Sequence, residues 1–423
     1  MLLNINIIEK DGELSKKMNE ALNRDRTLWI ISIAQFMIMQ VWYDFSAILS
    51  SVEELWNLTN FQAGMIISMF QLGYVFAVFY FSFLSDSRSP QNIFVFGALL
   101  TGISSLLFAF FAQGFYSALI FRTFAGIGMG GVYVPGMRLI TGIFPPQSRG
   151  KAIGIYVGSL VVGSGTSLLL SGALVKVLDW DTLIILTSIG ALLGAFLVYR
   201  MGEVSLNTVK GEFSWRQVKN ALSRPNVLMN FAYMGHMWEL YAMWPWIAPF
   251  LVAMFRLHGY STQNAMMYGN IIGGLSVIIG CIATWLGGFV SDKRGRIKSI
   301  LVFLIGSIAC SFTIGWVGEW SVYAVVIMAL LYGFFVIGDS PIFSTAITEL
   351  ADPKVAGLAL GIQSVMGFSV TIISPSVFGY IVDKTDSWGL AFSSLGLGAL
   401  LAPLVLMKLK KLPDSYKLAG GKQ

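Results

Sequence analysis

Long apolar stretches recur along the whole chain at nearly regular intervals, and this feature constrains the fold more than any other. The hydrocarbon core of a bilayer is crossed by about 20 apolar residues in helical conformation. Each of twelve stretches is long enough for one such crossing, so the sequence predicts an all-α membrane protein with twelve transmembrane helices. The stretches run roughly over 28–52, 62–84, 93–112, 115–143, 150–175, 182–199, 226–254, 265–290, 298–317, 321–347, 355–381 and 389–407.

The charged residues are few and lie mostly between these stretches. They make up 12% of the chain, against about 25% in soluble domains. Cys281 and Cys310 both fall in apolar stretches and have no spacing typical of a metal site or a disulfide framework. The residues up to about Arg26 are polar, so we expect no signal peptide. We therefore expect a chain embedded in a lipid bilayer, with no metal and no cofactor.

Lysine and arginine gather in alternate connections between the stretches. They are frequent before the first stretch, in the connection at 201–225 and after the last stretch, whereas the other side has only Lys176, Arg256 and Lys384. Basic residues remain in the cytoplasm when helices insert. The pattern predicts a multi-pass protein of the cell membrane with both termini cytoplasmic. The net charge of +6 is then a topology signal, and we expect no binding to nucleic acid.

The two halves of the chain repeat each other. The segment from Ser82 to Arg88 recurs about 206 positions later as Gly288 to Arg294, and Pro135 and Pro341 share that shift. Such a repeat is typical of duplicated transporters and predicts two pseudo-symmetric six-helix bundles. The predicted division is an N-terminal segment at 1–26, a first bundle at 27–200, a linker at 201–225, a second bundle at 226–408 and a tail at 409–423.

Two motifs make the resemblance to a known family specific. The run from Gly287 to Arg296 closely resembles the signature loop of the major facilitator superfamily, and the run from Arg122 to Gly130 resembles its fourth-helix motif. The resemblance implies the family's twelve-helix fold, transport by alternating access and a role for the signature loop in gating. In the first-half copy of the loop, Ser82 and Ser89-Pro90 replace the expected glycines and arginine. The gating residues implied are Asp86, Arg88, Asp292, Arg294 and Arg296.

Glycine-rich runs within the apolar stretches invite two other interpretations. The run from Gly126 to Gly131 superficially matches a dinucleotide fingerprint, which would require a preceding strand in a soluble unit. Close packing between helices explains these glycines better. In the fifth stretch Ser164 follows Gly163, where the family's antiporters usually have proline, so the resemblance to antiporters is incomplete.

Asp44 and Arg122 lie within apolar stretches at matching depths. Asp44 is about eight residues from the outer end of its stretch, or roughly 12 Å deep in a helix, and Arg122 lies at a similar depth in the fourth stretch. An ionisable side chain there costs about 2.5–3.5 kcal/mol on insertion scales, so pairing is expected. The pair resembles the proton-coupling pair of several family members, and a purely structural ion pair is the alternative.

The second half carries three further ionisable residues in its apolar stretches. Glu239 lies near the counterpart of Asp44 in the repeat, and His236 is one helical turn earlier on the same face. We expect this carboxyl group and histidine to exchange a proton near neutral pH or to contact substrate. Asp339 precedes Pro341, where the helix is expected to bend, and is a candidate for gating or proton relay. Glu349 is expected at the membrane interface.

Deep aromatic and amide side chains are candidates for the substrate cavity. Aromatic residues near the acidic groups are placed too far inside to belong to an interfacial belt. Amide side chains in apolar stretches serve equally well as hydrogen-bonding contacts between helices. The candidates are Trp42, Tyr43, Trp238, Tyr241, Gln40, Asn270 and Gln363.

A secondary transporter is the function that these features favour. We expect proton-coupled uptake of a small organic solute by a monomer, because the buried carboxylates suit protons, cations or zwitterions better than strongly anionic substrates. Export of lipophilic cations by proton antiport is the alternative, and a sensor that binds without transport is a third hypothesis. The first two stretches are weakly similar to cyanate- and nitrate-type permeases. The two histidines and sparse intramembrane acids offer no nucleophile-plus-base motif, so an enzyme is not expected.

Overall fold

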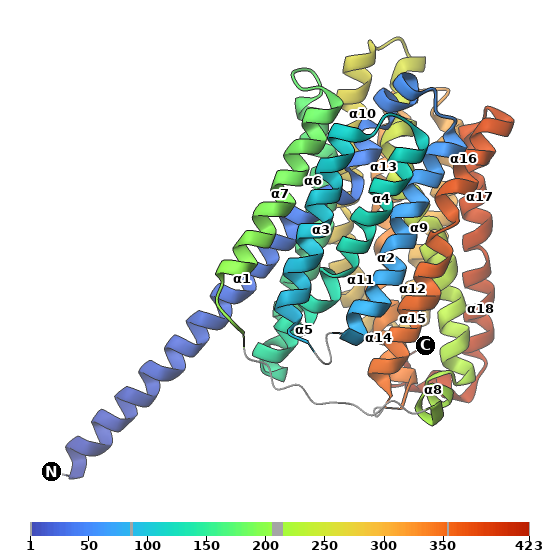
Figure 1. Cartoon of the computed structure of the whole chain (residues 1–423). Helices are drawn as coiled ribbons and strands as arrows, with labels where there is room; N and C mark the ends of the chain where they lie inside the picture. The colour runs from blue at the N-terminus through green and yellow to red at the C-terminus, as the bar shows by residue number, and fades with distance from the viewer. Residues whose placement is uncertain (1, 85–87, 205–214, 353–354, 423) are drawn as a thin grey trace.

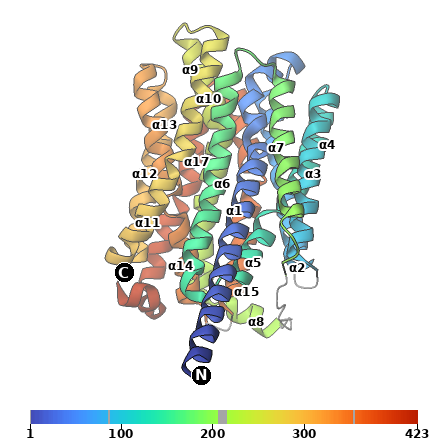
Figure 2. The ribbon, with the colours of Figure 1, turned by 90° about the vertical axis from the view of Figure 1, so that its left-hand side faces the viewer.

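The computed structural model of the chain is a bundle of long helices that run side by side (Figures 1 and 2). It describes residues 2–84, 88–204, 215–352 and 355–422, and twelve of its helical segments are long and apolar enough to cross a membrane. The first half contains α1 (Leu2–Trp56), α2 (Asn60–Leu84), α3 (Pro90–Phe111), α4 (Phe115–Gly130), α5 (Tyr133–Ile143), α6 (Pro146–Leu174) and α7 (Trp180–Arg200).

The second half follows a short helix in the linker, α8 (Trp215–Ala221), and closes with a 3₁₀ helix, η1 (Pro413–Gly421). Its helices are α9 (Arg224–Leu257), α10 (Thr262–Ile278), α11 (Gly280–Arg294), α12 (Arg296–Val317), α13 (Val322–Ile337), α14 (Ser340–Leu350), α15 (Ala356–Thr371), α16 (Ser374–Thr385), α17 (Trp388–Ala399) and α18 (Leu401–Lys410).

Several predicted spans are broken into two helices, and four of the five breaks precede a proline. α4 ends at Gly130 and α5 begins at Tyr133, two residues before Pro135. α13 gives way to α14 at Gly338-Asp339, just before Pro341. Proline lacks the N–H that an α-helix needs, and its ring clashes with the preceding turn. Because Pro135 and Pro341 are related by the repeat, the two halves bend at corresponding places.

The bundle has two distinct ends. α8 and the C-terminal residues lie at one, which we call the linker end, and the α1–α2 and α9–α10 connections lie at the other, the far end (Figures 1 and 2). The N-terminal part of α1 continues past the linker end as one helix with the first span, where the sequence predicts only a polar segment.

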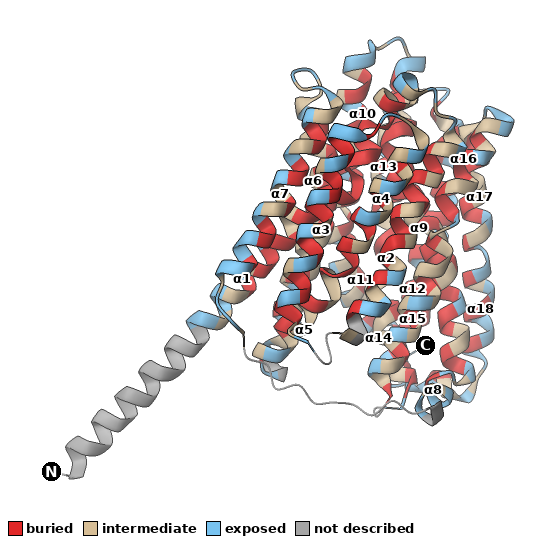
Figure 3. Ribbon diagram, viewed as in Figure 1, coloured by how far each residue is buried: buried red, intermediate tan, exposed pale blue. Residues whose placement is uncertain are grey.

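Buried residues face the inside of the bundle, and large apolar side chains are exposed on its outer surface (Figure 3). Phe76, Phe110 and Trp285 are each more than half exposed. An exposed apolar surface of this extent suits lipid rather than water.

Paired glycines bring corresponding helices into close contact in the two halves. A Cβ atom added at Gly126 of α4 would overlap the carbonyl oxygen of Phe70 in α2, and one at Gly333 of α13 would overlap that of Ser276 in α10. The shift between these positions is the shift of the sequence repeat. The prediction that Gly126 serves helix packing is therefore confirmed.

The two halves touch most closely toward the far end, where α6 packs on α10 and α2 packs on α16. The carboxylate of Asp383 in α16 accepts hydrogen bonds from the backbone N–H groups of Asn60 and Phe61, at 2.9 and 2.7 Å, and from the Asn60 side chain. Ser376 donates to Ser68, and Asn270 donates to the carbonyl oxygen of Ala47. Asp383 thus caps the N-terminus of α2 across the boundary between the halves.

Candidate functional site

Asp44 and Arg122 form a buried ion pair inside the first half. Nη1 of Arg122 lies 2.8 Å from Oδ1 of Asp44, and the two side chains are 3% and 1% exposed. The predicted contact between α1 and α4 is therefore present. The second carboxylate oxygen accepts a hydrogen bond at 2.9 Å from Thr187 of α7 and a longer one at 3.4 Å from Ser105 of α3. Four helices thus meet at this carboxylate.

Arg122 also holds the backbone of α1. It donates to the carbonyl oxygens of Val41 and Trp42 at 3.1 and 3.3 Å, and the ring of Phe70 lies beneath its guanidinium, with the centroid 4.6 Å away. Carbonyl oxygens and an aromatic face both favour a cation in a dry environment. The ion pair is thereby tied to the stretch of α1 that carries Trp42 and Tyr43.

Glu239 occupies a polar pocket of its own in the second half. Its carboxylate accepts hydrogen bonds from Ser307 of α12 at 2.9 Å and from Tyr332 of α13 at 3.0 Å. The repeat would place the counterpart of Ser105 at Ser311, one turn nearer the far end than Ser307. Glu239 therefore contacts α12 about one turn closer to the linker end than Asp44 contacts α3.

His236 contacts Asp339. Its Nδ1 lies 3.0 Å from Oδ1 of Asp339, and both side chains are 1% exposed. The rings of Tyr233 and Phe343 flank the imidazole at centroid distances of 5.6 and 5.5 Å. We expected His236 to lie beside Glu239 on the same helical face, but its polar partner in the structure is Asp339. The bend before Pro341 brings Asp339 to the histidine, whereas Glu239 faces α12 and α13.

Aromatic side chains from both halves meet between α1, α2, α9 and α15. We call Trp42, Tyr43, Tyr74, Tyr241, Trp244 and Phe368 the central aromatic cluster. Trp42 contacts Tyr241 at a centroid distance of 6.3 Å, Tyr43 contacts Trp244 at 5.9 Å, and Tyr74 contacts Phe368 at 5.2 Å. Within the described part of the chain, the buried Tyr43 hydroxyl and Trp244 indole N–H donate no hydrogen bond.

The other four cavity candidates lie elsewhere and join helices together. Gln40 donates to the carbonyl oxygen of Gly163, Asn270 to that of Ala47 and Gln363 to that of Phe343. Trp238 packs on Gly398 of α17, inside the second half. Their contacts fit the alternative of helix–helix contact, and the cluster partners Tyr74, Trp244 and Phe368 were missed because aromatic residues are common throughout this sequence.

The second-half signature loop is held by one arginine. Arg296 contacts Asp292, Glu349 of α14 at 2.7 Å and Ser291 at 2.7 Å. Glu349, which we expected at the interface, also accepts a hydrogen bond from the backbone N–H of Ala419 in η1. Arg294 instead is exposed and points into a surface cavity. Arg88 is exposed as well, and Asp86 lies outside the described residues.

Comparison with known proteins agrees with this geometry. Residues 31–375 match the Major Facilitator Superfamily, and the chain belongs to that family. The hexuronate transporter of Bacillus subtilis is 26% identical over 391 residues, covering 86% of this chain and 89% of the relative. A probable sulfoacetate transporter of Cupriavidus necator is 25% identical, covering 82% and 86%.

Solved structures share the fold at low sequence identity. A D-xylose-proton symporter aligns with a TM-score of 0.70 at 17% identity, covering 92% of this chain and 98% of the symporter. A bacterial homologue of the human lysosomal transporter Spinster, in an inward-facing and occupied conformation, aligns with a TM-score of 0.72 at 16% identity, covering 91% and 96%. The protein is thus a transporter-family membrane protein with two six-helix halves.

Proposed function

We propose that this protein imports small organic acids together with protons, by alternating access between its two halves. The observation that carries the proposal is the buried Asp44–Arg122 pair, which lies one residue from the central aromatic cluster and holds the backbone of the same helix. The pair therefore links a group that can exchange a proton to the surface where the halves meet.

In this mechanism Asp44 takes up the proton, and the guanidinium of Arg122 is thereby released from the ion pair. Protonation of Asp44 removes the charge that holds the guanidinium, while Thr187 and the backbone N–H of Phe45 keep the carboxyl group in place. Arg122 is then available to pair with the carboxylate of a substrate, as a guanidinium does readily. The Tyr43 hydroxyl and the Trp244 indole N–H supply two further donors at the cluster.

Glu239 and the His236–Asp339 pair are proposed to act in the second half. Glu239 exchanges a second proton, and the bend at Asp339 transmits the change to α14, which carries Glu349 of the signature-loop network. The linker end is proposed to be cytoplasmic, in accord with the basic residues there. The far end, closed by Asp383, then faces outward.

The substrate class rests on the named relatives and on the charge of the site. Those relatives transport a hexuronate or, in the second case, are described as probable transporters of sulfoacetate, and a further one from Corynebacterium glutamicum is a gentisate transporter. Because Arg122 is the one arginine or lysine at this depth in the described spans, a substrate with a single negative charge, such as a hexuronate or gentisate, fits better than a dianion such as sulfoacetate. This narrows the expectation that the buried carboxylates suit protons, cations or zwitterions better than strongly anionic substrates, because it admits an organic acid with one negative charge.

Flux into proteoliposomes tests the proposal. The panel comprises glucuronate, gentisate, sulfoacetate, D-xylose and the lipophilic cation tetraphenylphosphonium, each with and without an inward proton gradient. We expect gradient-driven accumulation of one of the monocarboxylates. Export of preloaded cation, driven by the same inward proton gradient, would favour drug antiport. Saturable binding without flux of any compound would favour a sensor and contradict the proposal.

A further inference from the structure

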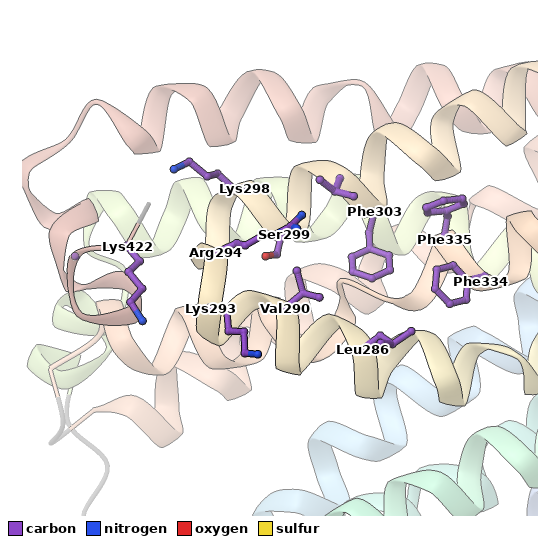
Figure 4. A pocket seen from close by; sticks show the side chains of 12 residues that line it. Leu286, Val290, Lys293, Arg294, Lys298, Ser299, Phe303, Phe334, Phe335 and Lys422 are labelled. Carbon is purple, nitrogen blue, oxygen red and sulfur yellow. The ribbon is translucent and has the colours of Figure 1, made fainter.

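A cavity on the outer flank of the second half is separate from the central site. It has a volume of about 760 Å³ and lies at the linker end between α11, α12, α13 and the end of η1 (Figure 4). Its size is that of a pocket for a small molecule or a lipid headgroup. Its two ends differ in chemistry, and it lies beside the apolar outer surface.

One end of the cavity is strongly basic. Lys293, Arg294, Lys298 and Lys422 line it: Figure 4 shows Lys293 and Arg294 at the end of α11, Lys298 in the first turn of α12 and Lys422 on the neighbouring C-terminal segment. None of the four forms an ion pair with a carboxylate in the described part of the chain. The nearest acids, Asp292 and Glu349, are both engaged by Arg296. Lys293 lies over the ring of Phe289, 4.1 Å from its centroid, and Lys422 donates to the carbonyl oxygen of Asp292, so Arg294 and Lys298 carry the charge that is most available to an anion.

The other end of the cavity is apolar and open to the outer surface. Leu286, Val290, Phe303, Phe334 and Phe335 line it, on the three helices that bear exposed side chains toward the membrane. Val302, which also lines the cavity, is 59% exposed, and Ile305 of α12 and Ile282 of α11 are similarly exposed. An acyl chain is the expected neighbour of such a surface.

A buried polar group points to a ligand between the two ends. Ser299 lines the cavity and is 2% exposed, and its hydroxyl has no hydrogen-bond partner in the described part of the chain. Figure 4 shows it beside Arg294, where the basic and apolar parts of the wall meet. A buried hydroxyl is usually paired, and here an oxygen of a bound phosphate ester would pair with it.

We propose that this cavity binds an anionic phospholipid, with its phosphate at Ser299 and the basic residues and its acyl chains along the phenylalanines. Basic pockets between transmembrane helices suit anionic headgroups. The lipid would sit against the signature loop, since Arg294 belongs to that loop and Lys422 donates to the carbonyl oxygen of Asp292. This site does not depend on the transported substrate.

Binding of phosphatidylglycerol to the purified protein in detergent, followed by native mass spectrometry, tests the site. We expect phosphatidylglycerol to bind at least about tenfold more tightly than phosphatidylcholine. The variant Arg294→Gln/Lys298→Gln should lose that preference. The matched control Lys408→Gln/Lys411→Gln removes the same charge from exposed positions outside the cavity and should keep it.

A third variant and a competition experiment complete the test. Ser299→Leu keeps every charge but replaces the hydroxyl by a larger apolar side chain at the expected phosphate position, so it should weaken phosphatidylglycerol binding. It therefore tests the site independently of the double variant. Glycerol 3-phosphate should not displace the lipid. Displacement by this soluble anion at similar affinity would show a free phosphate site, and equal loss in the control variant would show a bulk charge effect. Either result would overturn the proposal.

Discussion

At the scale of single residues, the charge of Asp44 is predicted to control both stability and coupling. Asp44→Asn leaves Arg122 buried without its counter-ion, which should lower the free energy of unfolding by about 3–5 kcal/mol. Flux should lose its dependence on pH, as measured in proteoliposomes over a range of external pH. Thr187→Val is the matched control, since it removes one hydrogen bond to the same carboxylate and should cost about 1 kcal/mol while keeping the pH dependence.

Restoration of charge balance provides the second arm of that experiment. Asp44→Asn combined with Arg122→Gln removes both charges and should recover most of the lost stability, because no uncompensated ion remains. Transport by Asp44→Asn with an unchanged response to pH would contradict the coupling role and leave a structural ion pair.

The two buried acidic residues of the second half, Glu239 and Asp339, are predicted to act through different partners, so that substitutions of each should have distinct effects. Glu239→Gln can accept a hydrogen bond from one of the Ser307 and Tyr332 hydroxyls and donate to the oxygen of the other, so it should fold, lose proton-driven accumulation and retain substrate exchange. His236→Asn should couple with Asp339→Asn in a double-mutant cycle by about 0.5–3 kcal/mol. The cycle of His236→Asn with Glu239→Gln should be additive, and strong coupling there would contradict the pairing described above.

At the scale of helices, the glycine contacts are predicted to be equivalent in the two halves. Gly126→Ala and Gly333→Ala each place a methyl group against a backbone carbonyl that cannot move independently, so each should cost about 1–3 kcal/mol. Gly154→Ala is the control, because its added Cβ would meet nothing within 4 Å. Thermal unfolding in detergent measures all three, and a tolerated Gly333→Ala would show that the helices can separate without loss.

The signature loop is predicted to depend on Arg296 rather than on Arg294. Arg296→Gln releases Asp292, Ser291 and Glu349 together, so it should slow transport by about tenfold or more. It should also change how readily thiol reagents reach cysteines placed at the linker end and at the far end of the bundle. Glu349→Gln should have a similar but smaller effect. Arg294→Gln is the charge-matched comparison in the same loop, and an equal effect on transport would show that loop charge matters more than these contacts.

At the scale of the whole molecule, Asp383 is predicted to hold the far end closed. Asp383→Ala removes three hydrogen bonds to α2 and should shift the population toward the conformation open at the far end. Ser68→Cys, in a background with Cys281 and Cys310 replaced by serine, should then react several-fold faster with a polar thiol reagent. Asp181→Ala at the same end is the control, and equal reactivity in all backgrounds would exclude this role.

The number of spans, the repeat, the family and the contact of Asp44 with Arg122 could all be predicted from the amino-acid sequence. These follow from local patterns, because the bilayer fixes span length and penalises any unpaired charge at depth. The bend before Pro341 was also predicted, since proline acts on its own helix, whereas α9 continues through Pro245 and Pro249 without a break. The roles of these residues in transport stay predictions.

The neutral groups that complete each site could be identified only from the packing of the helices. Thr187, Ser307 and Tyr332 have no distinguishing pattern, because serine, threonine and tyrosine are ordinary within membrane helices. The partners of His236, Arg296 and Asp383 depend on how far each helix is rotated and bent. A sequence pattern gives the face of one helix, but the side chain that it meets is set by the packing of the others, so His236 reaches Asp339 and not Glu239.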